Sequence, residues 1–362
     1  MPGRIAYVTP LYFAEQSYVG GGERYVLNLA RAVTRAAGGT LAVEVISYGV
    51  DARTSRLDGQ IKLRVLPTAR EPRHPLDAVS WEIAEALRNV DLVHVHQPFT
   101  RSGELAIIAS KFLGKPVCVT DLGGVASRVG LSSGILDVVD EVIALSRFSQ
   151  SLFRTATPVS VVKGGVDDEF FSPGKTVTRR DRFVYAGRLL PHKGIDRLLL
   201  ALPRGMPLTI CGRPYDEKYY RLLQKLAANK EVEFRLTATD EELRTLYRRA
   251  WGVVLPSVYV DLFGSSYVAP ELMGLTLLEA AACGAPGICS RVGGLPEFVI
   301  DGKTGFVFDS LPDLRGRLRR LARDSELVTR LGTEGQKLVK DRYGLRPVGA
   351  RILARYEKML EE

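Results

Sequence analysis

Two hydrophobic patterns alternate along the chain: short apolar runs typical of buried strands, and longer runs in which apolar residues recur every three or four positions. Val26, Leu29, Ala30 and Val33 illustrate the second pattern, because they share one face of a helix. The first half is predicted to contain strands at 4–13, 41–49, 91–97, 116–121 and 141–146, and helices at 23–36, 75–89 and 102–114. This order predicts a parallel sheet with helices on both faces.

The alternation starts again after a polar stretch at 172–181 that contains proline, glycine and several charges. The second half is predicted to contain strands at 182–189, 207–213, 232–237, 252–257 and 286–291, helices at 194–203, 217–230, 239–250, 275–284 and 295–301, a hairpin at 302–309, and mostly helix beyond it. We therefore predict an α/β protein with two tandem, doubly wound, Rossmann-like domains joined by a linker. Such sheets bind ligands at the carboxyl ends of their strands, so two domains facing each other would form one cleft.

Size and composition agree with this prediction, since 362 residues suffice for two domains and 46% of them are hydrophobic. No apolar run is long enough to cross a bilayer, and the chain starts on a predicted strand rather than a secretory signal, so we expect a cytoplasmic protein. The four scattered cysteines are expected to be buried packing residues. The net charge of +9 is compatible with phosphorylated ligands, acidic membrane surfaces and nucleic acid.

Three consecutive glycines, Gly20, Gly21 and Gly22, follow the first predicted strand and lead into a helix. Glycine lets the backbone approach a ligand closely, and a helix N-terminus attracts anions. A flexible surface turn is the plain alternative, but the position after the first strand favours a phosphate-binding loop. The run lacks the G-x-G-x-x-G fingerprint, so it does not indicate nicotinamide chemistry.

Two cations, Arg188 and Lys193, lie on the loop that leaves the first strand of the second half, between Gly187 and Gly194. Arginine offers a planar fork and lysine a point charge, which together suit a diphosphate. Ordinary solvated surface charge is the alternative, and the position at the carboxyl end of a strand favours binding.

Two glutamates, Glu271 and Glu279, lie on either side of a predicted helix start. Gly274 should break any helix that joins them, which places Glu271 on a loop and Glu279 inside the helix. The backbone N–H groups of Leu275 and Thr276 could then reach a phosphate. Because carboxylates repel phosphate, we expect the glutamates to accept hydrogen bonds from sugar hydroxyls and a ribose diol. Helix capping would explain one acidic residue, but not the pair.

Residues 271–308 resemble the signature of glycosyltransferase family 4, in which two glutamates are separated by seven residues. The resemblance extends in order to "GGGERYVLNLA", "DLVHVHQ", "ALSRFSQ", "VVKGGVDDEFF" and "YAGRLLPHKG", so it covers nearly the whole chain. It implies the GT-B architecture, with an acceptor-side domain at 1–172, a donor domain at 181–345, and a helix at 346–362 that packs back on the first domain.

The resemblance also implies roles for the matched residues. Glu271 would contact the transferred sugar and Glu279 the nucleotide ribose, while Arg188 and Lys193 would neutralise the donor diphosphate. The donor would be a UDP-, GDP- or ADP-linked sugar, transferred with retention of configuration and without a metal, and the sequence shows no Asp-x-Asp motif at a strand end. The predicted donor-binding set is Gly21, Gly22, Gly187, Leu275, Thr276 and Glu279, and the predicted catalytic set is Glu271, Arg188, Lys193 and Asp121.

The chain departs from the family pattern at three places. "LMG" follows Glu271 where the family usually has proline, phenylalanine and glycine, and the link at 258–270 is longer than usual. Asp121 stands near the place of a family histidine, and we treat it as the hypothetical general base. His94 and His96 lie on one face of the preceding strand and are expected to be packed and hydrogen-bonded rather than catalytic.

Three other functions stay open on the sequence alone: a sugar-nucleotide epimerase on the same fold, a non-catalytic sugar-nucleotide-binding module, and a nucleic-acid binder. The set of matched residues argues against the second, and the lack of a basic and aromatic recognition module argues against the third. The acceptor is open between glycan, lipid and small molecule. The arginine-rich segment 315–323 is expected to be a solvated surface, with peripheral contact to anionic lipid as the alternative.

Overall fold

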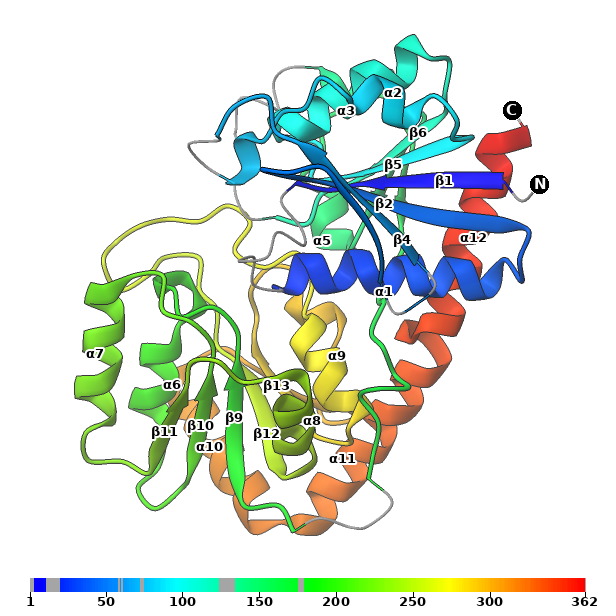
Figure 1. Cartoon of the computed structure of the whole chain (residues 1–362). Helices are drawn as coiled ribbons and strands as arrows, with labels where there is room; N and C mark the ends of the chain where they lie inside the picture. Colours follow the sequence, from blue (N-terminus) through cyan, green and yellow to red (C-terminus); the bar gives the residue numbers. More distant parts are fainter. Residues whose placement is uncertain are drawn as a thin grey trace. The chain divides into compact units, whose positions relative to one another are not determined.

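The structure is a computed structural model that describes residues 3–10, 20–57, 59, 61–71, 75–123, 134–174 and 179–361. The chain divides into two compact units. Unit 1 comprises residues 1–165 and 345–362, and unit 2 comprises residues 166–344. Each unit contains a mainly parallel sheet with helices packed on it, which confirms the predicted α/β class with two Rossmann-like sheets (Figure 1).

The sheet of unit 1 has the strand order β3-β4-β2-β1-β5-β6-β7-β8, and all neighbours are parallel except β3 and β4. Its strands are β1 Gly3–Val8, β2 Leu41–Gly49, β3 Arg53–Leu57, β4 Ile61–Pro67, β5 Leu92–His96, β6 Val117–Thr120, β7 Glu141–Ala144 and β8 Val159–Val161. The helical segments are α1 Gly21–Ala36, η1 Pro75–Asp77, α2 Ile83–Leu87, α3 Arg101–Phe112, η2 Ile135–Val138, α5 Arg147–Gln150 and α12 Leu345–Glu361.

Helix α12 completes unit 1 by packing against α1. Gly349 makes the close approach, because a Cβ at this position would collide with the carbonyl of Ala32. Tyr356 anchors the other half of the helix, since its hydroxyl lies 2.8 Å from the hydroxyl of Tyr7 and 2.6 Å from Nδ1 of His94. The core of unit 1 is therefore closed by a helix that is distant in sequence.

The sheet of unit 2 is parallel and has the order β11-β10-β9-β12-β13-β14. Its strands are β9 Arg182–Ala186, β10 Leu208–Cys211, β11 Val232–Arg235, β12 Ala250–Leu255, β13 Gly287–Ser290 and β14 Gly305–Phe308. The helical segments are η3 Pro191–Lys193, α6 Ile195–Ala201, α7 Glu217–Ala227, α8 Asp240–Arg248, α9 Leu275–Ala282, η4 Leu295–Glu297, α10 Leu311–Arg323, α11 Ser325–Leu338 and η5 Val339–Tyr343.

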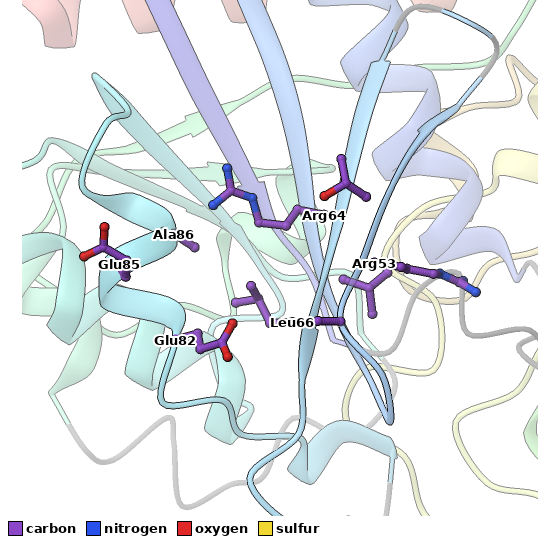
Figure 2. Close-up of a pocket in the computed structure, with 9 residues that line it drawn as sticks. Arg53, Arg64, Leu66, Glu82, Glu85 and Ala86 are labelled. Carbon is purple, nitrogen blue, oxygen red and sulfur yellow. The ribbon is translucent and has the colours of Figure 1, made fainter.

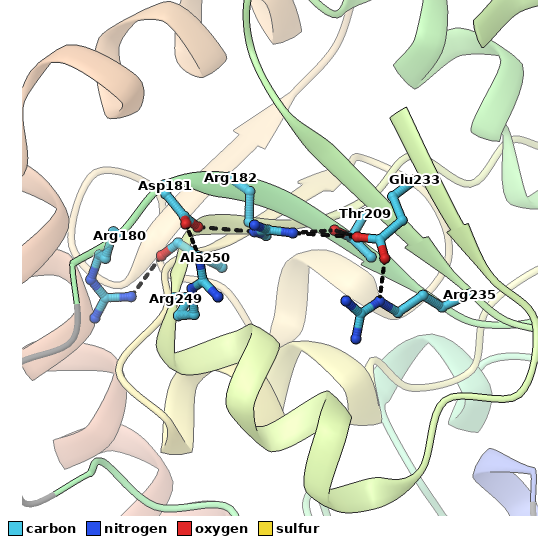
Figure 3. Close-up of polar contacts among 8 residues, drawn as sticks. All are labelled: Arg180, Asp181, Arg182, Thr209, Glu233, Arg235, Arg249 and Ala250. Atoms are coloured by element: carbon cyan, nitrogen blue, oxygen red, sulfur yellow. Dashed lines mark hydrogen bonds and ion pairs between the residues drawn. The ribbon is translucent and has the colours of Figure 1, made fainter. Parts of the chain in front are cut away.

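A row of charges starts at the amino-terminal ends of β9 and β12 and runs to β11, whose last residue is Arg235 (Figure 3). Asp181 pairs with Arg182 at 2.9 Å and also with Arg249. Arg182 continues the row to Glu233 at 3.4 Å, and Glu233 also pairs with Arg235 at 2.8 Å. We call Asp181, Arg182, Glu233, Arg235 and Arg249 the amino-edge network, and it links β9, β11 and the residue before β12.

Helix 75–89 was predicted wrongly as one element. Only η1 and the short α2 form there, because the Ala69 N–H donates to the Val79 carbonyl and ties this stretch to the segment that follows β4. The Ser80 hydroxyl also accepts from the Glu82 N–H, which starts a new turn. One bond to the segment after β4 and one side-chain bond thus interrupted a pattern that looked helical.

Two further predictions failed near the end of unit 2. Residues 295–301 form only the short turn η4, and the predicted hairpin at 302–309 is instead β14, which pairs in parallel with β13. The Asp301 carboxylate accepts from the Val307 N–H and the Thr304 hydroxyl from the Ile300 N–H, so side chains turn the chain directly into the strand. In the described residues, β1 ends at Val8, and the predicted strand residues 11–13 lie outside them.

Candidate functional site

Strands β9 and β12 lie next to each other at the centre of the unit 2 sheet, where the strand order reverses direction. Ligands of open α/β sheets bind at such a reversal, beyond the carboxyl ends of the strands. Strand β9 ends at Ala186 and leads into Gly187, Arg188 and Lys193, while β12 ends at Leu255 and leads into Ser257. The fold thus places the predicted cation loop at the position expected for a ligand.

Lys193 and Glu271 meet at this edge although 78 residues separate them. Lys193 Nζ lies 2.6 Å from Glu271 Oε1, and the Ser257 hydroxyl donates to the same oxygen at 2.6 Å. The side chains of Lys193 and Glu271 are only 14% and 9% exposed. A charge pair with so little contact with water depends on hydrogen bonds from the protein, because water does not solvate it. We call Lys193, Ser257 and Glu271 the carboxyl-edge cluster.

Two glycines shape the cation loop. Gly194 adopts φ +64°, and a Cβ there would collide with the Pro256 carbonyl. Gly187 donates its N–H to the Cys211 carbonyl at 3.0 Å, and its own carbonyl lies so close to Gly212 that a Cβ at Gly212 would strike it. The loop therefore lies flat against the neighbouring strand ends, which brings its cations over the sheet edge.

The backbone of Glu271 is fixed from the opposite side. Its carbonyl accepts the Gly294 N–H at 2.9 Å, and Gly293 at φ +55° leaves room for that carbonyl. The hydroxyl of Tyr259 accepts the Gly293 N–H at 2.8 Å. Glu271 thus has its side chain and its main chain anchored by separate segments.

Helix α9 begins at Leu275, so Glu271 precedes the helix and Glu279 lies within it, as the break at Gly274 predicts. No side chain caps the helix start among the described residues. Thr276 donates its hydroxyl to the Ala186 carbonyl at 3.3 Å, which ties the helix start to the end of β9. Glu279 is buried, and the Tyr247 hydroxyl of α8 donates to it at 3.3 Å.

In unit 1 the predicted residues gather at the carboxyl ends of β1 and β6. Helix α1 begins at Gly21, and a Cβ at Gly22 would lie 3.6 Å from Leu122, the neighbour of Asp121. Burial raises the pKa of Asp121 above its ordinary value, although the Gly123 N–H donates to the carboxylate at 3.0 Å and lowers it. The glycine run and Asp121 are thus brought onto one edge of the sheet.

Sequence reasoning missed Gln97 in this neighbourhood. It has φ +63° although it is not a glycine, and a proline follows it, which makes the left-handed conformation more unfavourable still. Its side chain donates to the Gly123 carbonyl at 3.1 Å, so it supports the loop that carries Asp121. Backbone strain of this kind is frequent at functional sites. The signal in the sequence was a polar residue before proline at a strand end.

His94 and His96 lie on β5, and His96 ends that strand directly before Gln97. Both are fully buried and their rings stack at 4.2 Å between centroids, as strand alternation predicted. His94 bonds to Tyr356 and, at 2.8 Å, to the Thr120 hydroxyl, and burial lowers its pKa to about 3. The expected packed and hydrogen-bonded role is confirmed for His94, whereas the His96 ring makes no hydrogen bond with the described residues.

A separate hollow of about 480 Å³ lies between α2 and the β3–β4 pair of unit 1 (Figure 2). Glu82, Glu85 and Ala86 line one side and Arg64 and Leu66 of β4 the other. None of the residues predicted from the sequence lines it. It therefore adds nothing to the chemistry predicted for the strand ends.

Four of the five arginines of α10, namely Arg315, Arg319, Arg320 and Arg323, are exposed, in agreement with the expected solvated surface. Arg315 donates to the carbonyls of Leu200 and Ala201 on α6, and Arg317 pairs with Asp313 at 3.0 Å. All four cysteines are buried, as expected. In the described part of the chain no helix is long and apolar enough to cross a membrane, and no three histidine, cysteine, aspartate or glutamate side chains gather as a metal site.

Family comparisons match both halves of the chain. Residues 166–338 match the family described as "Glycosyl transferases group 1", and residues 19–170 match "Glycosyltransferase Family 4". The chain is 31% identical over 240 residues to the GDP-mannose-dependent alpha-(1-6)-phosphatidylinositol monomannoside mannosyltransferase of Mycolicibacterium smegmatis, covering 59% of this chain and 61% of that protein. The alignments span about half to three-fifths of the first curated relatives.

Solved structures share the fold. Sucrose-phosphate synthase from Thermosynechococcus elongatus aligns with a TM-score of 0.76 and 20% identity, over 99% of each chain. The HepE protein of Anabaena, solved with UDP and glucose, aligns with a TM-score of 0.76 and 17% identity, over 98% of this chain and 100% of HepE.

Proposed function

Because this chain belongs to the group 1 glycosyltransferases of family 4, we propose that it transfers a sugar from a nucleoside-diphosphate sugar to a hydroxyl acceptor. The observation that carries the proposal is the carboxyl-edge cluster, which joins a cation and a carboxylate at the ligand-binding reversal of the unit 2 sheet. The relatives named above are a mannosyltransferase and a synthase, which favours transfer over epimerisation. The proposal further includes retention of configuration and no metal.

In the proposed mechanism, breaking the bond between sugar and diphosphate leaves negative charge on the diphosphate. Arg188 and Lys193 oppose that charge, and the N–H groups of Leu275 and Thr276 at the start of α9 add partial positive charge. Such preorganised donors stabilise the transition state more than the ground state, because the charge develops only as the bond breaks. Cations and N–H groups would thus stabilise the charge on the diphosphate in place of a metal ion.

The carboxylates are proposed to hold hydroxyls rather than phosphate. Glu271 would accept from the transferred sugar, because within the described residues the Lys193 and Ser257 bonds go to one oxygen and leave the second available for another donor. Glu279 would accept from the ribose. On the acceptor side, Asp121 would take the proton of the attacking hydroxyl, supported by its raised pKa, and Gly21 and Gly22 would admit the diphosphate.

The acceptor class and the nucleotide stay proposals to be tested. The mannosyltransferase relative is described as GDP-mannose-dependent and HepE was solved with UDP, so relatives differ in the base. We propose a cytoplasmic enzyme acting in polysaccharide or glycolipid synthesis. For the α10 arginines, contact with an anionic membrane stays the alternative to a solvated surface.

Thermal unfolding tests the proposal directly, because a ligand that binds the folded state raises the melting temperature. The protein is melted with UDP, GDP, ADP and their glucose or mannose forms, in magnesium and in EDTA. We expect one nucleotide series to raise the melting temperature equally in both conditions. A shift that needs magnesium would contradict the metal-free part, and no shift with any series would contradict donor binding.

A further inference from the structure

The long link before Glu271 forms an ordered hairpin at 259–267 in the structure. Val260 and Ser266 pair as an antiparallel bridge, and the Tyr267 N–H donates to the Tyr259 carbonyl at 2.8 Å. The Asp261 N–H donates to the Ser265 carbonyl at 3.0 Å. The segment that departs from the family pattern therefore forms an ordered hairpin.

Asp261 organises this hairpin from within. One carboxylate oxygen accepts the N–H groups of Phe263 and Ser265 at 2.8 and 3.0 Å, and the other accepts the Tyr267 hydroxyl at 2.8 Å. Burial raises the pKa of Asp261, but these hydrogen bonds outweigh it and leave the pKa below its ordinary value. Asp261 is thus a carboxylate whose acceptor sites are used inside the hairpin, and it fixes the Tyr267 side chain.

The hairpin holds His192 by both its main chain and its ring. The Val258 N–H donates to the His192 carbonyl at 2.9 Å, and the Tyr267 ring lies 4.8 Å from the imidazole, centroid to centroid. His192 directly precedes Lys193 of the carboxyl-edge cluster. The extra residues before Glu271 therefore end against the cation loop, and they set where an imidazole lies beside the proposed donor site.

The His192 imidazole is half-buried and accepts or donates no hydrogen bond among the described residues. Burial, and then the charge of Lys193, lower its pKa to about 4, against the opposing charge of Glu271. At neutral pH the ring is uncharged, so one nitrogen donates and the other accepts. A group with both capacities matches a hydroxyl, which also donates and accepts. The nearby cations Arg188 and Lys193 already suit the phosphates.

We propose that His192 binds a hydroxyl of the transferred sugar, and that Tyr267 and Asp261 are positioning residues that hold its ring in place. The inference rests on the proposed function, because it takes the carboxyl-edge cluster as the place where sugar and diphosphate lie. In this proposal the hairpin serves recognition of the sugar rather than of the nucleotide.

The test compares dissociation constants for UDP, GDP and ADP with those for their glucose or mannose forms, in the full chain and in two variants. We expect His192→Phe to weaken binding of the sugar nucleotide about three- to tenfold, the worth of one hydrogen bond, and to leave the free diphosphate unchanged. His192→Gln keeps a neutral donor and acceptor and should restore most of the affinity.

For the His192→Phe variant, two results would overturn the inference: unchanged sugar-nucleotide affinity, or an equal loss for the free diphosphate. The second would assign His192 to the phosphates instead. A wild-type protein that binds free diphosphates but no sugar nucleotide also overturns it, while one that binds neither removes the proposed function itself. Melting curves of both variants check that they are folded.

A double variant distinguishes the positioning role of Tyr267 from a merely structural one. We expect Tyr267→Ser to reduce sugar-nucleotide affinity as His192→Phe does, and the double variant to lose little more, because both changes remove one arrangement. Tyr215→Ser is the matched control, since Tyr215 is an exposed tyrosine that precedes α7. Full additivity of the two losses would contradict the positioning role.

Discussion

The two edges of the unit 2 sheet carry charge in different ways. The amino-edge network spreads five charged side chains over several partners, and its members include Glu233, whose side chain is 47% exposed (Figure 3). In the carboxyl-edge cluster, Lys193 and Ser257 both bond to one carboxylate oxygen of Glu271, and the charged side chains are far less exposed. Exposed pairs with several partners contribute little each, whereas a buried pair becomes costly once one member is lost. The first arrangement tolerates change, and the second is suited to hold a ligand.

The largest expected difference between the two edges concerns activity. Arg188→Ala should lower the rate of sugar transfer by about 10²–10³, because it removes one preorganised cation from the leaving group. Arg182→Ala removes an arginine from the opposite edge of the same sheet and is the matched control. Steady-state transfer from the donor found in the melting screen measures both, and equal losses would contradict the assignment of the site to the carboxyl edge.

The second difference concerns stability. Lys193→Met leaves Glu271 without its cation in a nearly solvent-free place, so we expect a loss of about 3–5 kcal/mol in the free energy of unfolding. The double change Lys193→Met/Glu271→Gln removes both charges and should recover most of that loss. Urea unfolding measures each variant. A double variant as unstable as the single one would show that packing, and not the charge pair, dominates.

The third difference concerns the backbone. Gly194 and Gly205 both have a positive φ, but a Cβ at Gly194 would collide with the Pro256 carbonyl, whereas no atom of the residues that the structure describes lies within 4 Å of one at Gly205. We expect Gly205→Ala to cost about 1 kcal/mol from the left-handed conformation alone, and Gly194→Ala at least about 2 kcal/mol. Thermal unfolding of the two variants compares them. Equal losses would mean that the cation loop can move away from β12.

The smallest effect is an acid dependence at the amino edge. Burial raises the pKa of Asp181, but its bonds to Arg182 and Arg249 lower it more, so the folded pKa lies below the unfolded one. The stability from this pairing is therefore present above the unfolded pKa, about 4, and is lost as the pH falls through the folded pKa.

Asp181→Asn should accordingly cost less than about 1 kcal/mol at pH 7, because the pair is partly exposed, and almost nothing at the lowest pH that still permits refolding. Urea titrations of the wild type and the variant at both pH values measure the difference. A penalty that grows towards acid would reverse the sign and refute the assigned cause.

Local chemistry decided which features could be predicted. The start of α9 followed from Gly274, since a glycine there interrupts a helix whatever surrounds it. Strand β3 was missed because it is "RTSRL", a polar sequence that pairs with β4 at the sheet edge, whereas β4, "IKLRVLP", was missed although its apolar and charged residues alternate. Helix 75–89 was overpredicted because the Val79 carbonyl accepts from Ala69, beyond β4, and the Ser80 hydroxyl starts a new turn.

Contacts between distant segments could not be predicted. The sequence singled out Lys193 and Glu271 separately, but nothing in it indicates that they bond to each other or that Ser257 joins them. The meeting of Tyr267 and His192 depends on the path of an inserted hairpin, which periodicity does not record. The roles of all these residues with a donor stay predictions until ligands are measured.

Helix α12 belongs to unit 1 but follows unit 2 in the chain, and this order has a consequence for biosynthesis. A ribosome that adds about 5–20 residues per second needs roughly ten to forty seconds to make the residues between the two parts of unit 1. During that time α12 does not yet cover unit 1. The surface of α1 that packs against Gly349 is open, and so are the His94 and Tyr7 side chains that contact Tyr356. The nascent first unit must stay soluble with an open core, while the second unit, continuous in sequence, can fold at once.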